Sequence, residues 1–213
     1  MPKIWFALLG LLSAILISPE PAAAAAPRQL LADAQTVLAI TKDDRILGNP
    51  TAPITIVEYA SLTCPHCAHF AKDVLSELKK KWIDTGKAKL VFRDYPLDEP
   101  ALRAAMIARC ASPDRFFAYI DTFFGAQDKW VTARDYQDAL ARLAKLGGMS
   151  KDEFDHCLKN TALENKIVEG RLIASKELDV NSTPTFFING TKFTGAPTAE
   201  EFDKALSGIS AKS

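Results

Sequence analysis

The sequence predicts an α/β fold that is interrupted by a helical insertion. A strand-like run, Ile54–Tyr59, is followed by a helical pattern and then by a second strand-like run, Lys89–Arg93. Residues 98–160 carry helical patterns only, and two further strand-like runs flank Asn189-Gly190 near the C-terminus. Two strands joined through a helix are expected to pair in parallel, whereas an Asn-Gly pair between strands is typical of a hairpin.

The composition is that of a globular protein without a charge bias. Of 213 residues, 48% are hydrophobic and 24% are charged, and 26 Lys and Arg balance 26 Asp and Glu. These values argue against intrinsic disorder. The balanced charge gives no indication of a nucleic-acid-binding surface.

The first 26 residues have the pattern of an export signal. Lys3 precedes an uncharged stretch, Ile4–Ile17, and small residues follow at Ala22–Ala26. The uncharged stretch is shorter than the about 20 residues that a transmembrane helix needs. We therefore expect cleavage near Ala24–Ala26 and a periplasmic protein, with an uncleaved membrane anchor as the alternative.

The segment before the first strand has two parts. Residues 27–42 are a lead-in, in which a helix and an edge strand over Val37–Thr41 are equally compatible with the pattern. Residues 43–53 contain Gly48, Asn49, Pro50 and Pro53 and are predicted to be a loop. Ile54–Tyr59 is then predicted as a strand because it is rich in β-branched residues.

The later elements follow from periodicity and turn residues. Ala68–Trp82 places its apolar residues on one helical face, and Gly86 ends this unit. Aromatic and aliphatic stripes in 98–160 are expected to form helical core, and Thr161–Leu178 is predicted as a long helix. A final helix is expected to begin near Thr198, where a capping residue precedes two glutamates.

The run Cys64-Pro65-His66-Cys67 is the motif that indicates chemistry. It lies between a predicted strand and a predicted helix. Unpaired N–H groups at a helix N-terminus stabilise a thiolate, so Cys64 is expected to be the acidic, reactive sulfur. Cys67 is then placed to attack it in a mixed disulfide. Pro65 suits an early helical position, and His66 is a candidate for adding a positive charge or a donor.

Other roles for this cysteine pair are weaker. A structural disulfide over so short a loop restrains little of the unfolded chain. A zinc site could draw on His66, His69 and His156, but the second cysteine pair typical of zinc ribbons is missing. The motif, the strand before it and the later Thr183-Pro184 together favour redox chemistry.

The chain resembles the DsbA family of periplasmic thiol oxidases. The resemblance rests on the run from Glu58 through Cys64-Pro65-His66-Cys67 to Phe70, and on the run from Ser182 to Gly190 that contains Thr183-Pro184. It covers roughly Ile54 to the C-terminus. It implies a thioredoxin fold with a helical insertion domain, divided into residues 27–97 and 161–213 for the thioredoxin-like domain and 98–160 for the insertion.

The resemblance also implies roles for single residues. Cys64 would be the attacking and attacked sulfur and Cys67 the buried resolving one. Pro184 would be a cis-proline facing the pair, with the Thr183 backbone binding substrate as an added strand; an ordinary trans-proline opening a strand is the alternative. Glu58 matches a buried acid that exchanges protons with Cys67, although strand alternation equally allows it to face solvent.

Cys110 and Cys157 form a second pair within the predicted insertion. In an oxidising compartment two further cysteines in one subdomain are expected to bridge, and two separate buried thiols are the alternative. Such a bridge occurs in some members of the family.

The predicted activity is donation of the Cys64–Cys67 disulfide to reduced exported proteins. The family pattern implies reoxidation by a membrane quinone reductase of the DsbB type, a monomer, and no cofactor or metal beyond the redox-active disulfide. The rivals are a periplasmic disulfide isomerase or reductase, which Thr183 favours because the best-known oxidases carry Val there, and a non-catalytic peptide-binding chaperone. Residues 27–53 are too few for the dimerisation module of known isomerases.

Overall fold

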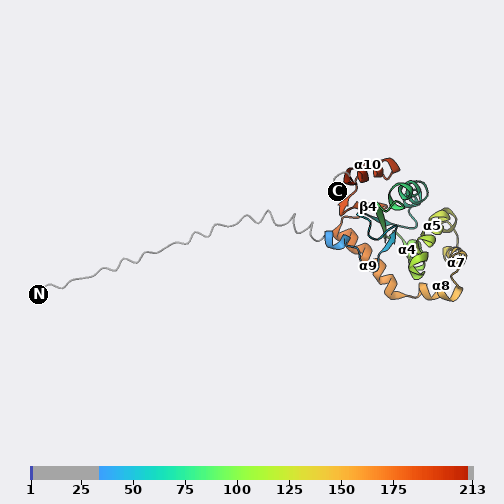
Figure 1. The fold of residues 1–213 in the computed structure, drawn as a ribbon. Coiled ribbons are helices and arrows are strands. Elements are labelled where there is room, and N and C mark those ends of the chain that lie inside the picture. The colour runs from blue at the N-terminus through green and yellow to red at the C-terminus, as the bar shows by residue number, and fades with distance from the viewer. Residues whose placement is uncertain (2–33, 211–213) are drawn as a thin grey trace.

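The computed structural model describes Met1 and residues 34–210, and Figure 1 shows them as a sheet with helices packed around it. The strands are β1 (Arg45–Leu47), β2 (Ile54–Ala60), β3 (Ala88–Asp94), β4 (Thr185–Ile188) and β5 (Thr191–Lys192). Their order in the sheet is β1-β3-β2-β4-β5. Strands β2 and β3 pair in parallel and all other pairs are antiparallel. The predicted α/β class is confirmed.

Alternation along β2 assigns its side chains to two different cores. Ile54 and Ile56 pack in one cluster with the helices on one face of the sheet. Val57 and Tyr59 pack in another cluster on the opposite face, together with the helix α9 (Thr161–Glu177). Since residues of a strand alternate between faces, Glu58 lies on the same face as Ile54 and Ile56. That face is covered by the helical segment that carries the two cysteines.

The lead-in and the predicted loop differ in part from the sequence expectation. Residues 34–38 are helical and no strand forms over Val37–Thr41, while residues 27–33 of the lead-in lie outside the described residues. The loop prediction for 43–53 was wrong over Arg45–Leu47, because β1 forms there and pairs antiparallel with β3. Three residues are too short for a recognisable alternation, so only the partner strand makes this segment a strand.

The segment after β2 is one helical path that alternates between α- and π-helical stretches. It consists of α2 (Pro65–His69), η2 (Phe70–Val74), α3 (Leu75–Leu78) and η3 (Lys79–Ile83), where both η elements are π-helical. The helix therefore begins three residues earlier than the predicted Ala68. Phe70 packs against Phe186 of β4 and Phe202 of the last helix, which fixes this path onto the sheet.

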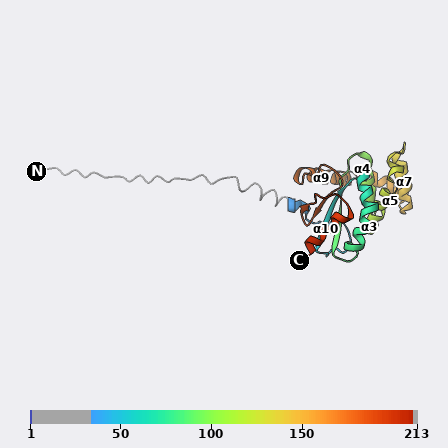
Figure 2. The same cartoon turned by 90° about the horizontal axis from the view of Figure 1, so that it is seen from above.

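All regular elements in residues 98–160 are helices, as predicted. The elements are α4 (Glu99–Cys110), η4 (Pro113–Arg115), α5 (Phe116–Gly125), α6 (Gln127–Val131), α7 (Tyr136–Leu146) and α8 (Lys151–Leu158). In Figures 1 and 2, α7 lies on the far side of α4 and α5 from α10. A disulfide joins Cys110 at the end of α4 to Cys157 in α8, which is the pair that the sequence suggested.

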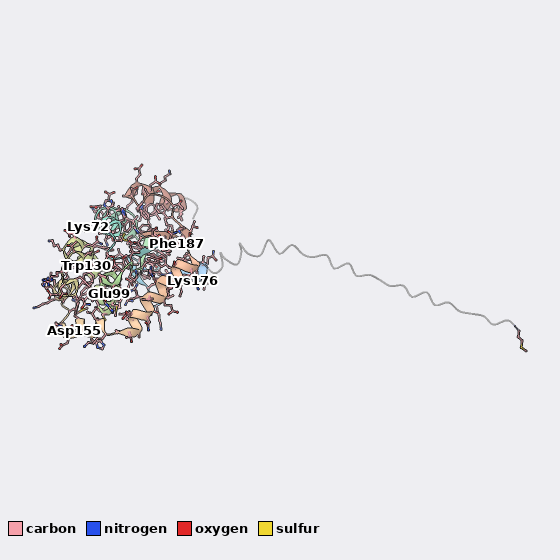
Figure 3. The ribbon with its side chains drawn as sticks, turned by 180° about the vertical axis from the view of Figure 1, so that it is seen from behind. Lys72, Glu99, Trp130, Asp155, Lys176 and Phe187 are labelled. Carbon is pink, nitrogen blue, oxygen red and sulfur yellow. A yellow bond between two sulfur atoms is a disulfide. The ribbon has the colours of Figure 1, made fainter. Side chains whose placement is uncertain are left out.

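The insertion core extends up to the cysteine motif. One continuous cluster contains Phe123 and Trp130 of the insertion together with Leu62, Cys64 and Cys67. Figure 3 labels Trp130 on the insertion side of the molecule and Phe187 in the sheet. The insertion is therefore packed directly against the motif rather than held apart from it.

The C-terminal elements agree with the predicted hairpin and final helix. Asn189-Gly190 joins β4 to β5, and both residues have positive φ, as a tight hairpin turn requires. Helix α10 (Ala199–Ser210) buries Phe202 and Leu206 against the sheet. The predicted export signal, residues 1–26, lies outside the described residues apart from Met1. Among the helices that are described, none combines the length and the apolar character needed to cross a bilayer.

Removing the second disulfide is predicted to destabilise the fold. The sequence separation of 47 between Cys110 and Cys157 closes a long loop in the unfolded chain. The double variant Cys110→Ala, Cys157→Ala should lose roughly 2–4 kcal/mol of unfolding free energy. Urea unfolding of variant and wild type measures this, and equal unfolding midpoints and slopes would contradict the prediction.

Candidate active site

Cys64 and Cys67 lie at the N-terminus of α2 and are both free thiols. Cys64 is the N-cap, with extended backbone angles, and Pro65 occupies the first helical position. Cys64 is 5% exposed and Cys67 is fully buried. Pro65 and His66, between the two cysteines, are exposed to solvent. Cys64 is called the outer sulfur below, because it is the more exposed of the two.

The Thr183–Pro184 loop faces the outer sulfur. The peptide bond between Thr183 and Pro184 is cis. The Cys64 sulfur lies 3.2 Å from the Thr183 carbonyl oxygen, across a sequence separation of 119 residues, and donates a hydrogen bond to it when the thiol is protonated. The Thr183 hydroxyl is buried and has no hydrogen-bond partner of ordinary geometry among the described residues. The two segments that the sequence singled out therefore meet at Cys64.

Hydrogen bonding lowers the pKa of Cys64 to about 5. The largest contribution is a hydrogen bond from the Cys67 thiol, and burial opposes it. The Thr183 side chain and the backbone amides of Cys67 and His66 contribute further in the lowering direction. Donors that bind the charged form favour it, so Cys64 is a thiolate at neutral pH.

His66 acts on the sulfur through its backbone. The sequence analysis proposed that His66 adds either a positive charge or a hydrogen-bond donor near the Cys64 sulfur. In the structure its backbone amide is a donor that stabilises the Cys64 thiolate. The imidazole is exposed to solvent. Within the described part of the chain, no hydrogen bond or ion pair joins this imidazole to Cys64.

The pKa values of Cys67 and Glu58 are raised, in contrast to the lowered pKa of Cys64. Burial is the main cause that raises the pKa of Cys67, and its hydrogen bond to Cys64 and the nearby Glu58 charge add to it. Burial also raises the pKa of Glu58 to about 8, with a further contribution from the Cys64 charge. Glu58 is 2% exposed, so the solvent-facing alternative was wrong. The site thus combines one anionic sulfur with two groups that hold their protons.

A polar network that the sequence analysis missed supports the loop before Cys64. Thr63 donates to the carboxylate of Asp98 over 2.8 Å, and its hydroxyl lies 3.2 Å from that of the buried Ser61. Asp98 also caps α4 by accepting from the Ala101 amide. Only the capping role leaves a local signal, because the Thr63–Asp98 contact joins residues 35 apart in sequence.

A zinc site was one alternative considered for the histidines and cysteines. Across Met1 and residues 34–210, no three His, Cys, Asp or Glu side chains are grouped in a way that could hold an ion. His69 instead pairs with Asp73, one turn further along the helix.

The hydrogen bond between the two cysteines can be tested with a matched pair of variants. Cys67→Ala removes the donor, whereas Cys67→Ser keeps an O–H donor at the same place. We expect the pKa of Cys64 to rise by about one unit or more in the alanine variant, as a lost hydrogen bond to a charged group implies. In the serine variant the pKa of Cys64 should stay closer to the wild-type value. Wild-type protein with both thiols reduced is the reference. The pH dependence of Cys64 alkylation measures these values, and equal pKa values in the two variants would be the contrary result.

The raised pKa of Glu58 predicts how the free energy of unfolding depends on pH. The folded carboxyl keeps its proton up to a pKa of about 8, whereas the ordinary pKa of a solvated glutamate is 4.5. The folded state therefore binds more protons between these values, and its stability falls as pH rises through this window. Glu58→Gln removes this loss, so the reduced variant should gain stability over reduced wild type as pH rises from about 4.5 to 8. Urea unfolding across this range measures the difference, and a difference independent of pH would count against a buried, protonated Glu58.

Comparison with known proteins places this site in a family. The sequence family described as Thioredoxin matches residues 40–207. A protein of Rickettsia conorii that is assigned as a protein-disulfide oxidoreductase is 34% identical over 154 residues, which are 72% of this chain. The match covers 56% of that relative, so the chain spans little more than half its length.

Two solved structures match over most of their length. The crystal structure of Wolbachia pipientis alpha-DsbA1 has a TM-score of 0.78 and 33% identity, covering 84% of this chain and 96% of that one. A protein-disulfide isomerase from Novosphingobium aromaticivorans has a TM-score of 0.70 and 26% identity, covering 80% of this chain and 98% of that one. Together with the cysteine site and the sheet order, these matches show that the chain belongs to the thioredoxin family, in its DsbA-like branch.

Proposed function

We propose that the protein is a thiol:disulfide oxidoreductase that donates the Cys64–Cys67 disulfide to reduced exported proteins. The observation that carries the proposal is the electrostatic asymmetry of the pair: a pKa of about 5 for Cys64 and a raised pKa for Cys67. A fold that stabilises the thiolate stabilises the reduced form relative to the disulfide. The disulfide form is therefore a good electron acceptor.

The proposed reaction consists of two exchanges. A substrate thiolate attacks the Cys64 sulfur, the Cys64–Cys67 bond breaks, and Cys67 leaves with the electron pair and takes up a proton. A second substrate thiolate then attacks the substrate sulfur of the mixed disulfide and releases Cys64 as a thiolate. The substrate dithiol loses two electrons and two protons, of which one proton ends on Cys67 and one in solvent. A low pKa makes Cys64 the better leaving group in the second step.

Glu58 is proposed as the proton donor to Cys67. Cys67 is buried and has a raised pKa, so it cannot leave as a lasting anion. Glu58 is buried nearby and holds a proton up to about pH 8. One of its carboxyl oxygens has no partner among the described residues. A carboxyl group of this kind is suited to pass a proton to a sulfur that becomes basic during the exchange.

Thr183 and Pro184 are proposed to bind the substrate chain. The Thr183 carbonyl lies beside the Cys64 sulfur, next to the cis bond, which supports a path for the substrate peptide along this backbone. Pairing with the main chain as an added strand orients a substrate without reading its sequence. This suits an enzyme that oxidises many different proteins.

The location and partners of the protein are proposed from its family likeness. Export to the periplasm would place the pair where disulfides persist. Reoxidation by a membrane quinone reductase of the DsbB type would return two electrons per cycle to the quinone, and the protein would act as a monomer. The redox-active disulfide would serve without a further cofactor or metal.

An isomerase or reductase is the second candidate function. Thr183 before the cis-proline favours it, and so does the likeness to the solved isomerase from Novosphingobium. An isomerase also needs an anionic Cys64, since it attacks misplaced substrate disulfides. The two activities therefore differ in redox potential and in substrate handling rather than in the identity of the nucleophile. A non-catalytic peptide-binding chaperone would need neither sulfur.

The deciding experiment is the equilibrium of the Cys64–Cys67 pair with glutathione, combined with oxidation of a reduced test peptide. We expect the pair to stay reduced at glutathione ratios that oxidise an ordinary dithiol, and the disulfide form to oxidise the peptide stoichiometrically. Cys64→Ser should abolish peptide oxidation, whereas a chaperone would keep its function. Faster repair of a misbridged protein than oxidation of a reduced one would instead assign the isomerase activity.

A further inference from the structure

The first residue of α6 contacts the cysteine loop from inside the insertion. Gln127 is 8% exposed, and its side-chain amide nitrogen donates to two backbone carbonyls. The acceptors are the oxygens of Leu62, over 2.8 Å, and of Cys64, over 3.0 Å. A Gln amide has two N–H donors, so both are used on this loop.

These two hydrogen bonds join the loop to the start of the helix. The Cys64 carbonyl also accepts from the Ala68 amide over 3.2 Å, which is the first hydrogen bond of α2. Gln127 therefore holds Leu62 in the loop and the N-cap residue of α2 with one side chain. On the same loop Thr63 is bound by Asp98, the residue that begins the insertion. The insertion thus holds the segment before the reactive sulfur at two points.

Gln127 itself is rigidly placed. Trp130, one turn further along α6, is 1% exposed and donates through its indole nitrogen to the Phe123 carbonyl over 2.9 Å. Its ring also packs against Phe123. Because α6 is anchored in the insertion core in this way, the Gln127 amide is held in place rather than free to follow the loop.

The position of Cys64 decides how well its sulfur is solvated by protein donors. Most of these donors lie on the helix that Cys64 caps: the Cys67 thiol and the amides of Cys67 and His66, with the Thr183 side chain as a further contribution from the cis-proline loop. Hydrogen bonds weaken steeply with misalignment, so a small shift of the N-cap residue costs the thiolate more than the thiol. The disulfide form is less dependent on these donors because its sulfurs carry no charge.

We propose that Gln127 of the helical insertion is a positioning residue that holds Cys64 in the geometry its thiolate requires. This inference rests on the proposed function, because it assigns to the insertion a part in setting the oxidising strength of the pair. Gln127 is placed to act through the loop backbone, with no direct hydrogen bond to either sulfur. The insertion then contributes to the chemistry as well as to the shape of the protein.

The test compares two substitutions at this position. Gln127→Met keeps the length of the side chain without donors, and Gln127→Glu offers at most one donor in either protonation state. In both variants we expect the pKa of Cys64 to rise by about one unit, as the loss of one well-placed hydrogen bond implies. The equilibrium with glutathione should shift about tenfold toward the disulfide, since one pKa unit corresponds to a factor of ten. Cys64 alkylation against pH and the glutathione equilibrium measure the two effects.

Two control variants separate positioning from general loosening. Gln137→Met makes the same chemical change at an exposed position of α7 and should leave both values unchanged. Leu140→Ala opens a cavity in the same insertion core, where Leu140 is fully buried, and should lower the unfolding temperature without moving the pKa of Cys64.

Each outcome bears on a different claim. A folded Gln127 variant with wild-type pKa and equilibrium values would overturn the inference, and so would an equal pKa shift in Leu140→Ala. An ordinary thiol pKa for Cys64 in the wild-type protein would instead overturn the proposed function, whatever the variants show.

Discussion

The hydrogen bond between the two cysteine sulfurs is the interaction on which the chemistry of this protein depends. It is the largest cause of the low pKa of Cys64, and the same bond helps to keep the proton on Cys67. One contact therefore divides two identical side chains into a nucleophile and a proton-bearing partner. Burial opposes the anion at Cys64, so the thiolate exists only because donors are aimed at it.

The fold surrounds the cysteine pair by bringing three distant segments to one point. Strand β2 ends at the loop that carries Cys64, and its alternation buries Glu58 on the face covered by the cysteine-bearing helix. The cis-proline loop before β4 reaches Cys64 because β4 pairs with β2 in antiparallel register. The insertion contacts the loop that carries Cys64, through hydrogen bonds with Asp98 and Gln127. Each segment is short, and the sheet sets their relative positions.

The same arrangement buries polar atoms at an energetic cost, and these atoms belong to the proposed active site. Glu58 has a buried carboxyl oxygen without a hydrogen-bond partner among the described residues, and the buried Thr183 hydroxyl has none of ordinary geometry there. Unsatisfied polar atoms of this kind destabilise a fold, and they are expected where a group must change its protonation state or meet a substrate. Both atoms belong to residues for which the family likeness implies a role in catalysis or substrate binding.

The sequence by itself determined the fold class, the long elements and the place of the cysteine pair between a strand and a helix, because these depend on local periodicity and on a four-residue motif. It left Glu58 undecided, since alternation alone does not say which face of a strand is covered. It did not predict β1, whose three residues form a strand only through pairing with β3. The Thr63–Asp98 and Gln127–Cys64 contacts join residues 35 and 63 positions apart, and such contacts leave no pattern in a single sequence. Only the tertiary structure decides them, because a hydrogen bond depends on where the chain places two groups in space.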